Sequence, residues 1–235
     1  TVGTGIPSHG KSNFTDWMVL NLIKDYNMKA SWFSPEHSPM SLYHTNLMEK
    51  VIGRNFWQDT ETSIGKTPRI TKEEINDYEN WANEKIYLTG AEGTQLPTWD
   101  WLIDKFKEQM YSFGIDIFVI DAFNKVLLPK GNKIDMINQV LTKLTHFAQS
   151  NNVMIILVAH PTKMQKNEDG TSTIPDLYSV SGSADFRNQT HNGFTIHRTW
   201  ADDETGQENT TSFYNQKTKF NFQGKIGGKV DFNYC

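Results

Sequence analysis

Two apolar runs along the chain predict buried strands. Ile115–Ile120 is almost wholly apolar and ends at Asp121, and Val153–Ala159 is likewise apolar and ends at His160. Such runs are typical of central strands in a parallel sheet, which are covered on both faces. Between them, residues 135–150 carry apolar side chains at helical spacing, namely Ile137, Leu141, Leu144 and Phe147. The order strand, helix, strand predicts a βαβ unit.

The rest of the chain alternates between the same two kinds of element. The pattern predicts short strands at 29–34 and 86–89, and helices at 11–26, 42–51, 71–84 and 98–113. Thr71-Lys-Glu-Glu74 is a capping box for the third of these helices. After a polar loop at 163–176, closing strands that we expect to be antiparallel are predicted at 194–198, 212–220 and 229–234. The chain is therefore expected to form an α/β domain, with a mostly parallel twisted sheet, helices on both faces and antiparallel C-terminal strands.

Composition excludes several classes of protein. The chain has 235 residues, with 23 Lys and Arg against 27 Asp and Glu, so its net charge of −4 excludes a simple polycation. A local basic stripe can still bind nucleic acid. The one cysteine, Cys235, excludes an intrachain disulfide and a thiolate zinc site. The longest apolar run has seven residues, whereas a membrane span needs ~20. We expect no membrane partner and a reducing, cytoplasmic compartment in preference to a mitochondrial one.

The first twelve residues carry the strongest motif. Gly5-Ile-Pro-Ser-His-Gly-Lys-Ser12 matches the phosphate-binding pattern G-x-x-x-x-G-K-[ST] between a predicted strand and a predicted helix. Backbone N–H groups of such a loop face phosphates, the lysine reaches the β and γ oxygens, and the hydroxyl takes a Mg²⁺ position. We therefore predict ATP, or another nucleoside triphosphate, with Mg²⁺ as cofactors. The residues assigned to the nucleotide are Gly5, Pro7, Ser8, His9, Gly10, Lys11, Ser12 and Asn13.

Three polar residues follow predicted strands and suit nucleotide hydrolysis. Asp121 is the residue expected to hold Mg²⁺ together with Ser12, although a strand-terminal Asp is also common as a turn cap. Glu36 could polarise the attacking water, and an exposed loop carboxylate is an equally good interpretation. His160 could sense the γ-phosphate, with a core histidine that has its hydrogen bonds satisfied as the alternative.

Together these positions resemble the RecA-like motor domain of the DnaB and Twinkle hexameric helicases. The resemblance covers nearly the whole chain, so we expect residues 1–235 to form one motor domain. Within this family the chain is most similar to the Twinkle and phage primase-helicase branch, because His160 stands where bacterial DnaB proteins carry Gln. Its motifs are the phosphate loop, Ser34-Pro-Glu36, Ile120-Asp-Ala122, Val158-Ala-His-Pro-Thr-Lys163, Ser181-Gly-Ser-Ala-Asp-Phe-Arg187 and Asn192-Gly193. The resemblance implies a RecA-like P-loop NTPase core and an ATP-driven replicative DNA helicase that unwinds duplex DNA.

The resemblance also implies roles for individual residues. Lys11, Ser12 and Asp121 would bind Mg-ATP, Glu36 would be the catalytic carboxylate, and His160 would couple the γ-phosphate to the DNA loops. Lys217 and Lys219 match the tract from which a neighbouring subunit normally supplies an arginine; an exposed strand with alternating lysines is the alternative. Arg198 and Phe232 would flank the nucleobase. The implied single-stranded DNA contacts are Lys163, Lys166 and Arg187, which a solvated charged loop would also explain.

The implied partners are further copies of the chain in a hexameric ring, and a primase domain or partner. Thr1–Gly5 is expected to be the end of a strand that follows an upstream linker region. Three other functions stay open: a RecA- or RadA-type recombination ATPase, a P-loop small-molecule kinase, and an ATPase that only loads or scaffolds replication proteins. The scattered positions of Arg54, Arg69, Arg187 and Arg198 disfavour the arginine-rich lid of a kinase.

Overall fold

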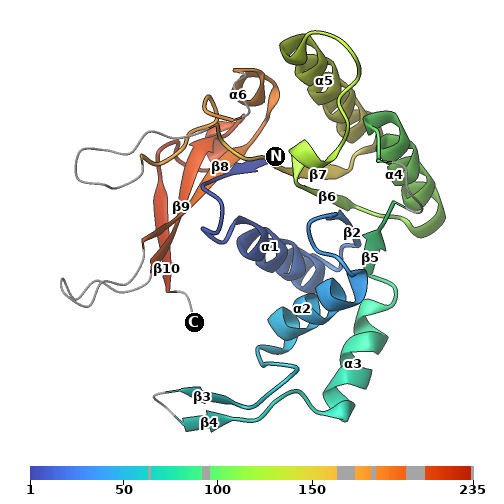
Figure 1. Ribbon diagram of the computed structural model, residues 1–235, viewed down its shortest axis with the longest axis vertical. Coiled ribbons are helices and arrows are strands. Elements are labelled where there is room, and N and C mark those ends of the chain that lie inside the picture. The colour runs from blue at the N-terminus through green and yellow to red at the C-terminus, as the bar shows by residue number, and fades with distance from the viewer. Residues whose placement is uncertain (63–64, 92–95, 163–172, 181–183, 200–209, 234–235) are drawn as a thin grey trace.

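The computed structural model of the protein describes residues 1–62, 65–91, 96–162, 173–180, 184–199 and 210–233. Within these residues an eight-stranded sheet runs through the molecule in the order β10-β9-β8-β1-β7-β6-β2-β5 (Figure 1). Its strands are β1 (Val2–Thr4), β2 (Ala30–Phe33), β5 (Ile86–Thr89), β6 (Ile117–Asp121), β7 (Met154–Val158), β8 (Gly193–Thr199), β9 (Thr210–Lys217) and β10 (Lys229–Asn233). A separate hairpin pairs β3 (Thr60–Thr62) with β4 (Gly65–Thr67).

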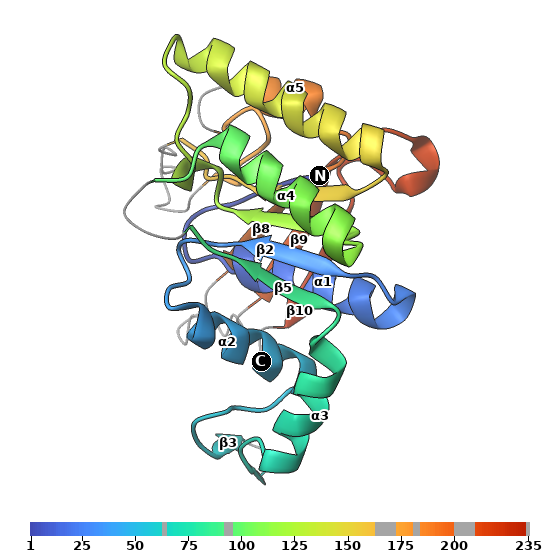
Figure 2. The same cartoon turned by 90° about the vertical axis from the view of Figure 1, so that its right-hand side faces the viewer.

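Helices cover both faces of the sheet (Figure 2). The α-helices are α1 (Lys11–Tyr26), α2 (Met40–Ile52), α3 (Lys72–Ala82), α4 (Trp99–Phe113), α5 (Lys133–Asn151) and α6 (Asp185–Gln189). Two short 3₁₀ turns, η1 (Phe123–Lys125) and η2 (Asn221–Gln223), follow β6 and β9. The predicted capping box is present at the start of α3, where the side chains of Thr71 and Glu74 each accept a hydrogen bond from the other's backbone N–H.

The alternation of side chains along β6 explains why two layers of helices form. Ile117 and Val119 lie in one buried cluster with residues of α1 and α2. Phe118 and Ile120 lie in a second cluster with residues of α4 and α5. Because successive strand residues point to opposite faces, a strand that is apolar at every position requires a cover on both sides. The prediction of a central strand at this place is confirmed.

The strands from β8 to β5 are parallel to one another. β8 is antiparallel to β9, as we expected for the C-terminal strands, but it also pairs in parallel with β1, Gly3 lying opposite Phe194, so it belongs to both parts of the sheet. Only the pairs β8–β9 and β9–β10 are antiparallel among the described strands of this sheet. Thr195 and Ile196 are buried as deeply as central-strand residues, which follows from the position of β8 beside β1. β9 also ends at Lys217, before the predicted end at residue 220, because the chain turns into η2.

Among the described residues, no helix combines the length and apolar character needed to cross a membrane.

Candidate nucleotide site

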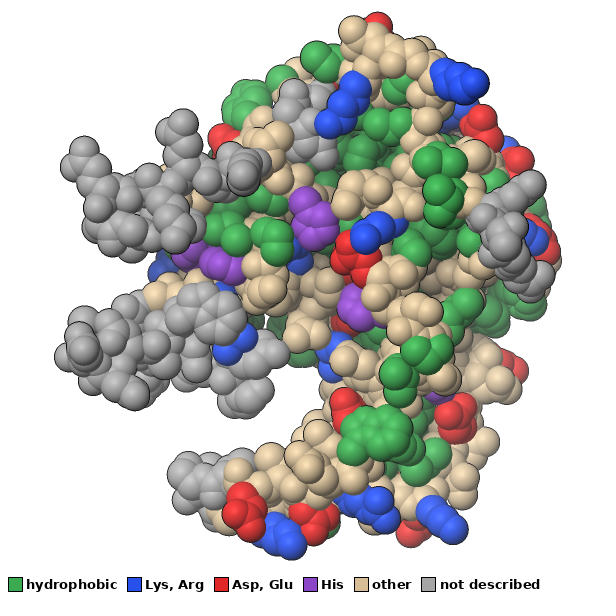
Figure 3. All heavy atoms as spheres, in the orientation of Figure 1, with side chains coloured by type: hydrophobic (Ala, Val, Ile, Leu, Met, Phe, Trp, Pro, Cys, Tyr) green, Lys and Arg blue, Asp and Glu red, His purple; other side chains and the backbone are tan. Residues whose placement is uncertain are grey.

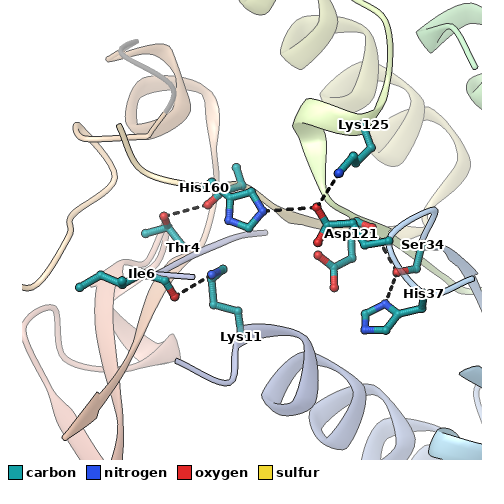
Figure 4. Close-up of polar contacts among 10 residues, drawn as sticks. Thr4, Ile6, Lys11, Ser34, His37, Asp121, Lys125 and His160 are labelled. Atoms are coloured by element: carbon teal, nitrogen blue, oxygen red, sulfur yellow. Dashed lines mark hydrogen bonds and ion pairs between the residues drawn. The ribbon is translucent and has the colours of Figure 1, made fainter. Parts of the chain in front are cut away.

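The predicted site residues meet at one edge of the sheet. Strands β1, β2, β6 and β7 are parallel, so their carboxyl ends share an edge, and each is followed by one predicted segment. Lys11, Glu36 and His160 follow β1, β2 and β7, and Asp121 is the last residue of β6. Figure 4 shows Lys11, Asp121 and His160 at this edge. Figure 3 shows acidic, basic and histidine side chains gathered in the middle of the face seen there. The sequence could place these residues only at strand ends; their proximity comes from the strand order.

The phosphate loop leaves β1 in a conformation that requires glycine at its start. Gly5 has a φ of +149°, and a Cβ atom there would lie 2.2 Å from the backbone oxygen of Ile196 in β8. Thr4 at the end of β1 donates from Oγ1 to the carbonyl oxygen of Ala159, 2.9 Å away. The loop therefore starts between β8 and β7, with its backbone held against both strands.

The loop ends at a helix terminus suited to an anion. Gly10 caps α1 in a left-handed conformation (φ +86°), and the cap makes no side-chain hydrogen bond. The first turn of α1 has no acidic residue. A helix N-terminus presents backbone N–H groups and a partial positive charge, so a phosphate is stabilised there. Ser8 also has a positive φ, of 67°, which matches the tight path of the loop.

Lys11 occupies a buried position beside two carboxylates. Its side chain is 6% exposed, and Nζ donates to the carbonyl oxygen of Ile6 at 2.9 Å. Burial lowers the pKa of Lys11 to about 8, and the negative charges of Asp121 and Glu36 act in the opposite direction. Burial thus penalises the charged ammonium of Lys11, and bound phosphates would stabilise that form.

This burial predicts a pH dependence of stability. A lysine whose pKa is lowered on folding destabilises the folded state while it is charged, and the penalty disappears as pH rises from about 8 to about 10.5. Relative to Lys11→Met, the wild-type free energy of unfolding should therefore rise by up to ~3 kcal/mol over this range. Urea unfolding of the wild type and of Lys11→Met at several pH values measures this difference in the free energy of unfolding. Parallel pH profiles would show that Lys11 is not penalised by burial.

Asp121 and Ser12 fit a divalent cation bound with a nucleotide. Asp121 is 2% exposed; burial raises its pKa, and a hydrogen bond with the Ser12 side chain opposes that rise. Among the described residues, Oδ1 of Asp121 has no hydrogen-bond partner. A buried carboxylate oxygen of this kind, next to a hydroxyl, matches the oxygen ligands that Mg²⁺ prefers. No group of three or more His, Cys, Asp or Glu residues in the described chain forms a metal site by itself.

Glu36 lies between two basic side chains. Its Oε1 is 3.3 Å from Nζ of Lys125 and 3.8 Å from Nε2 of His160 (Figure 4). The Glu36 side chain is 31% exposed, so it reaches both the buried site and solvent. Burial lowers the pKa of His160, and the positive charge of Lys11 lowers it further. A largely neutral His160 therefore contacts Glu36 at neutral pH.

A second set of contacts holds the segment that carries Glu36. Oγ of Ser34 donates to the backbone oxygen of Asp121 at 3.1 Å and lies 2.6 Å from Nδ1 of His37. The His37 ring stacks on Tyr43 of α2, with 4.5 Å between ring centroids. The hydroxyl of Tyr43 in turn donates to Oδ1 of Asp16 at 2.7 Å, within α1. The Glu36 segment is thus attached both to β6 and to the helix that follows the phosphate loop.

His9 connects the phosphate loop to β8. Its Nδ1 accepts the backbone N–H of Arg198 at 2.9 Å, and its ring lies 4.9 Å from that of His197. Burial, with His197 and other nearby positive groups, lowers the pKa of His9 to about 4, so the ring is neutral at pH 7 with its proton on Nε2. Phe232 of β10 contacts Phe14 of α1, with ring centroids 5.5 Å apart. Arg198 and Phe232 are therefore on the side of the phosphate loop formed by β8 and β10.

The remaining predicted residues lie elsewhere. Lys217 Nζ donates to the backbone oxygens of Arg187 and Asn188, at 2.6 and 3.2 Å. Lys219 is exposed, with Nζ 3.3 Å from Nε2 of His191. Arg187 donates to the backbone oxygen of Gln216 at 3.3 Å and lies over the ring of Tyr178. Lys163 and Lys166 lie outside the described residues.

Sequence reasoning missed Lys125 and the pair Ser34 and His37. The available signal for Lys125 was its place four residues after Asp121, since a turn that follows a strand end keeps its side chains near that end. Ser34 and His37 flank Glu36 in the sequence, and they act through tertiary contacts that no spacing predicts.

The sheet order, the phosphate loop on β1 and the acidic end of β6 define a RecA-like fold, as the resemblance in the sequence predicted. The comparisons with known proteins agree. Over 231 residues, 97% of the chain, it is 31% identical to the Twinkle homolog protein, chloroplastic/mitochondrial, of Arabidopsis thaliana. The chain spans about a third (32%) of the length of that relative.

A solved structure of an ATPase domain has the same fold. It superimposes with a TM-score of 0.70 over 98% of this chain and 79% of that one, at 16% sequence identity. No family model matches the chain.

Proposed function

We propose that this chain is the ATP-hydrolysing motor domain of a ring-forming replicative DNA helicase. The observation that carries the proposal is that Lys11, Asp121, Glu36 and His160 meet at the carboxyl edge of the sheet, in a chain similar along 97% of its length to a Twinkle homologue. The likeness to a solved ATPase domain supports the same interpretation of the fold. Hydrolysis would then drive movement along single-stranded DNA.

The geometry suggests how the chain's own residues would act. The α1 terminus and Lys11 would bind the phosphates, and Ser12 with Asp121 would hold Mg²⁺. A Mg²⁺ ion held there would supply positive charge that offsets the negative charge of the phosphates. Glu36 would accept the proton of the water that attacks the γ-phosphorus, with ADP and phosphate as products. His160 contacts Glu36 and precedes the segment with Lys163 and Lys166, our proposed DNA contacts together with Arg187.

The position of Lys219 supports a site completed by a neighbouring subunit. Lys217 lies opposite Gly193, which lies opposite Val2, so the end of β9 is at the start of β1 and away from the chain's own phosphate loop. Lys217 is engaged with backbone carbonyls, whereas Lys219 is exposed. We therefore assign the trans role to Lys219. As a lysine it supplies a point charge and lacks the two-pronged donor geometry of arginine.

Mixing two inactive variants tests this proposal. Glu36→Gln removes the base from its own site, and Lys219→Ala removes the charge given to a neighbour. Neither should hydrolyse ATP efficiently alone, and mixing should restore activity, because some junctions then combine an intact Glu36 with an intact Lys219. Lys225→Ala, in the next exposed turn, should stay active and serves as the matched control.

The wild-type rate should also rise more than linearly with protein concentration and should increase with single-stranded DNA. A rate that is linear, indifferent to DNA and unrestored by mixing would contradict the motor proposal. Phosphoryl transfer to a nucleoside monophosphate would favour the kinase instead. The hexameric ring size, the primase partner and the cytoplasmic compartment stay predictions; the relative's name places that protein in chloroplasts and mitochondria.

A further inference from the structure

Lys125 contacts the proposed catalytic carboxylate although no part of the mechanism above uses it. It ends η1, the short turn that follows β6 and Asp121. Its Nζ lies 3.3 Å from Oε1 of Glu36, the same oxygen that lies 3.8 Å from Nε2 of His160. Figure 4 shows Lys125 and His160 approaching this oxygen from different elements. Glu36 is therefore paired with the ammonium group of Lys125.

This contact opposes the role proposed for Glu36. A general base needs a free lone pair directed at the water proton. A carboxylate has two oxygens and about four lone-pair positions, and the ion pair with Lys125 occupies part of one oxygen and favours one orientation of the side chain. Drawing Lys125 away would leave Glu36 freer to turn toward the attacking water.

The surroundings of Lys125 indicate what could do so. Its side chain is 44% exposed. The connection 122–133 that contains it carries Lys125, Lys130 and Lys133 and no Asp or Glu. Lys130 and Lys133 are both exposed. A polyanion that approached this connection would meet three ammonium groups, and Lys125 is the one in contact with the site.

We propose that Lys125 restrains Glu36 until a phosphate of bound single-stranded DNA takes the ammonium group from it. DNA binding thereby releases the base and accelerates hydrolysis. This inference rests on the proposed function. Partly exposed ion pairs are weak, so removing the restraint should change DNA affinity and the hydrolysis rate without DNA by about two- to fivefold.

The test is a double-mutant cycle read by DNA affinity, with no need for hydrolysis. Fluorescence anisotropy with labelled oligo(dT), Mg²⁺ and a non-hydrolysable ATP analogue is measured for wild type, Glu36→Gln, Lys125→Ala and the double variant. Because coupling is reciprocal, Glu36→Gln should tighten DNA binding about two- to fivefold by freeing Lys125. In the Lys125→Ala background the same change should have no effect. Lys125→Ala should also reduce the slope of log affinity against log salt by ~0.7, the value for one phosphate contact.

A control and an activity assay complete the test. Lys143 forms a comparable exposed pair with Asp100, at 2.6 Å, so Lys143→Ala should leave the effect of Glu36→Gln unchanged. Hydrolysis without DNA should rise about two- to fivefold in Lys125→Ala and in Lys125→Gln, with a smaller further increase on adding DNA. Nucleotide affinity should stay at the wild-type value.

Three results would overturn the inference. The first is a change in DNA affinity caused by Glu36→Gln that is the same with and without Lys125. The second is a rate of ATP hydrolysis without DNA that is unchanged or lower in Lys125→Ala. The third is weakened nucleotide binding in that variant, which would assign Lys125 to the nucleotide. Failure of the motor proposal has a different signature, because the wild type would then bind no DNA and show no stimulation.

Discussion

Glu36→Gln is expected to reduce ATP turnover by about 10²- to 10⁴-fold while nucleotide affinity stays close to that of the wild type. Glutamine keeps the size of the side chain but cannot accept the proton of the attacking water. Glu36 lies on the segment after β2 and makes no hydrogen bond to the phosphate loop among the contacts of the described residues, so binding should be spared. Steady-state ATPase assays and titration with a fluorescent nucleotide separate the two effects.

Glu61→Gln is the matched control, since Glu61 lies in the separate β3–β4 hairpin. Its turnover should equal that of the wild type. Near-normal turnover in Glu36→Gln would show that another group activates the water, and equal losses of turnover and affinity would assign Glu36 to binding.

Gly5→Ala should destabilise the fold by about 2 to 5 kcal/mol and abolish nucleotide binding. The added Cβ would lie 2.2 Å from the backbone oxygen of Ile196. Ile196 is fully buried in β8 and paired with Phe213 of β9, so it cannot move aside without breaking the sheet. Denaturant unfolding and nucleotide titration measure the two consequences.

Gly114→Ala is the control for backbone strain alone. Gly114 also has a positive φ, of 69°, at the end of α4, but a Cβ atom there would have no neighbour within 4 Å. Gly114→Ala should lower the free energy of unfolding by only ~1 to 2 kcal/mol and leave nucleotide binding intact. If Gly5→Ala lowered the free energy of unfolding no more than Gly114→Ala does, this result would contradict the close approach of the phosphate loop to β8.

The apolar pattern by itself determined the elements and the class of fold. A run such as Ile115–Ile120 has to be covered on both faces, so it required a parallel sheet between two layers of helices. The motif at Gly5–Ser12 specified phosphate chemistry locally, because a glycine turn, a lysine and a hydroxyl at that spacing need no distant partner to be recognised. The positions of Glu36, Asp121 and His160 at strand ends followed from the same pattern.

The tertiary structure decided which of these residues meet. Pairing of β1 with both β7 and β8 placed β8 parallel to β1 and brought Ile196 against Gly5, and nothing in the local sequence of β8 indicates that neighbour. The contact of Lys125 with Glu36 joins residues 89 positions apart in sequence, from the ends of two adjacent strands. Local composition specifies the period of each element, whereas strand order depends on the free energy of the whole packed core, and this is why such contacts appear only in the folded molecule.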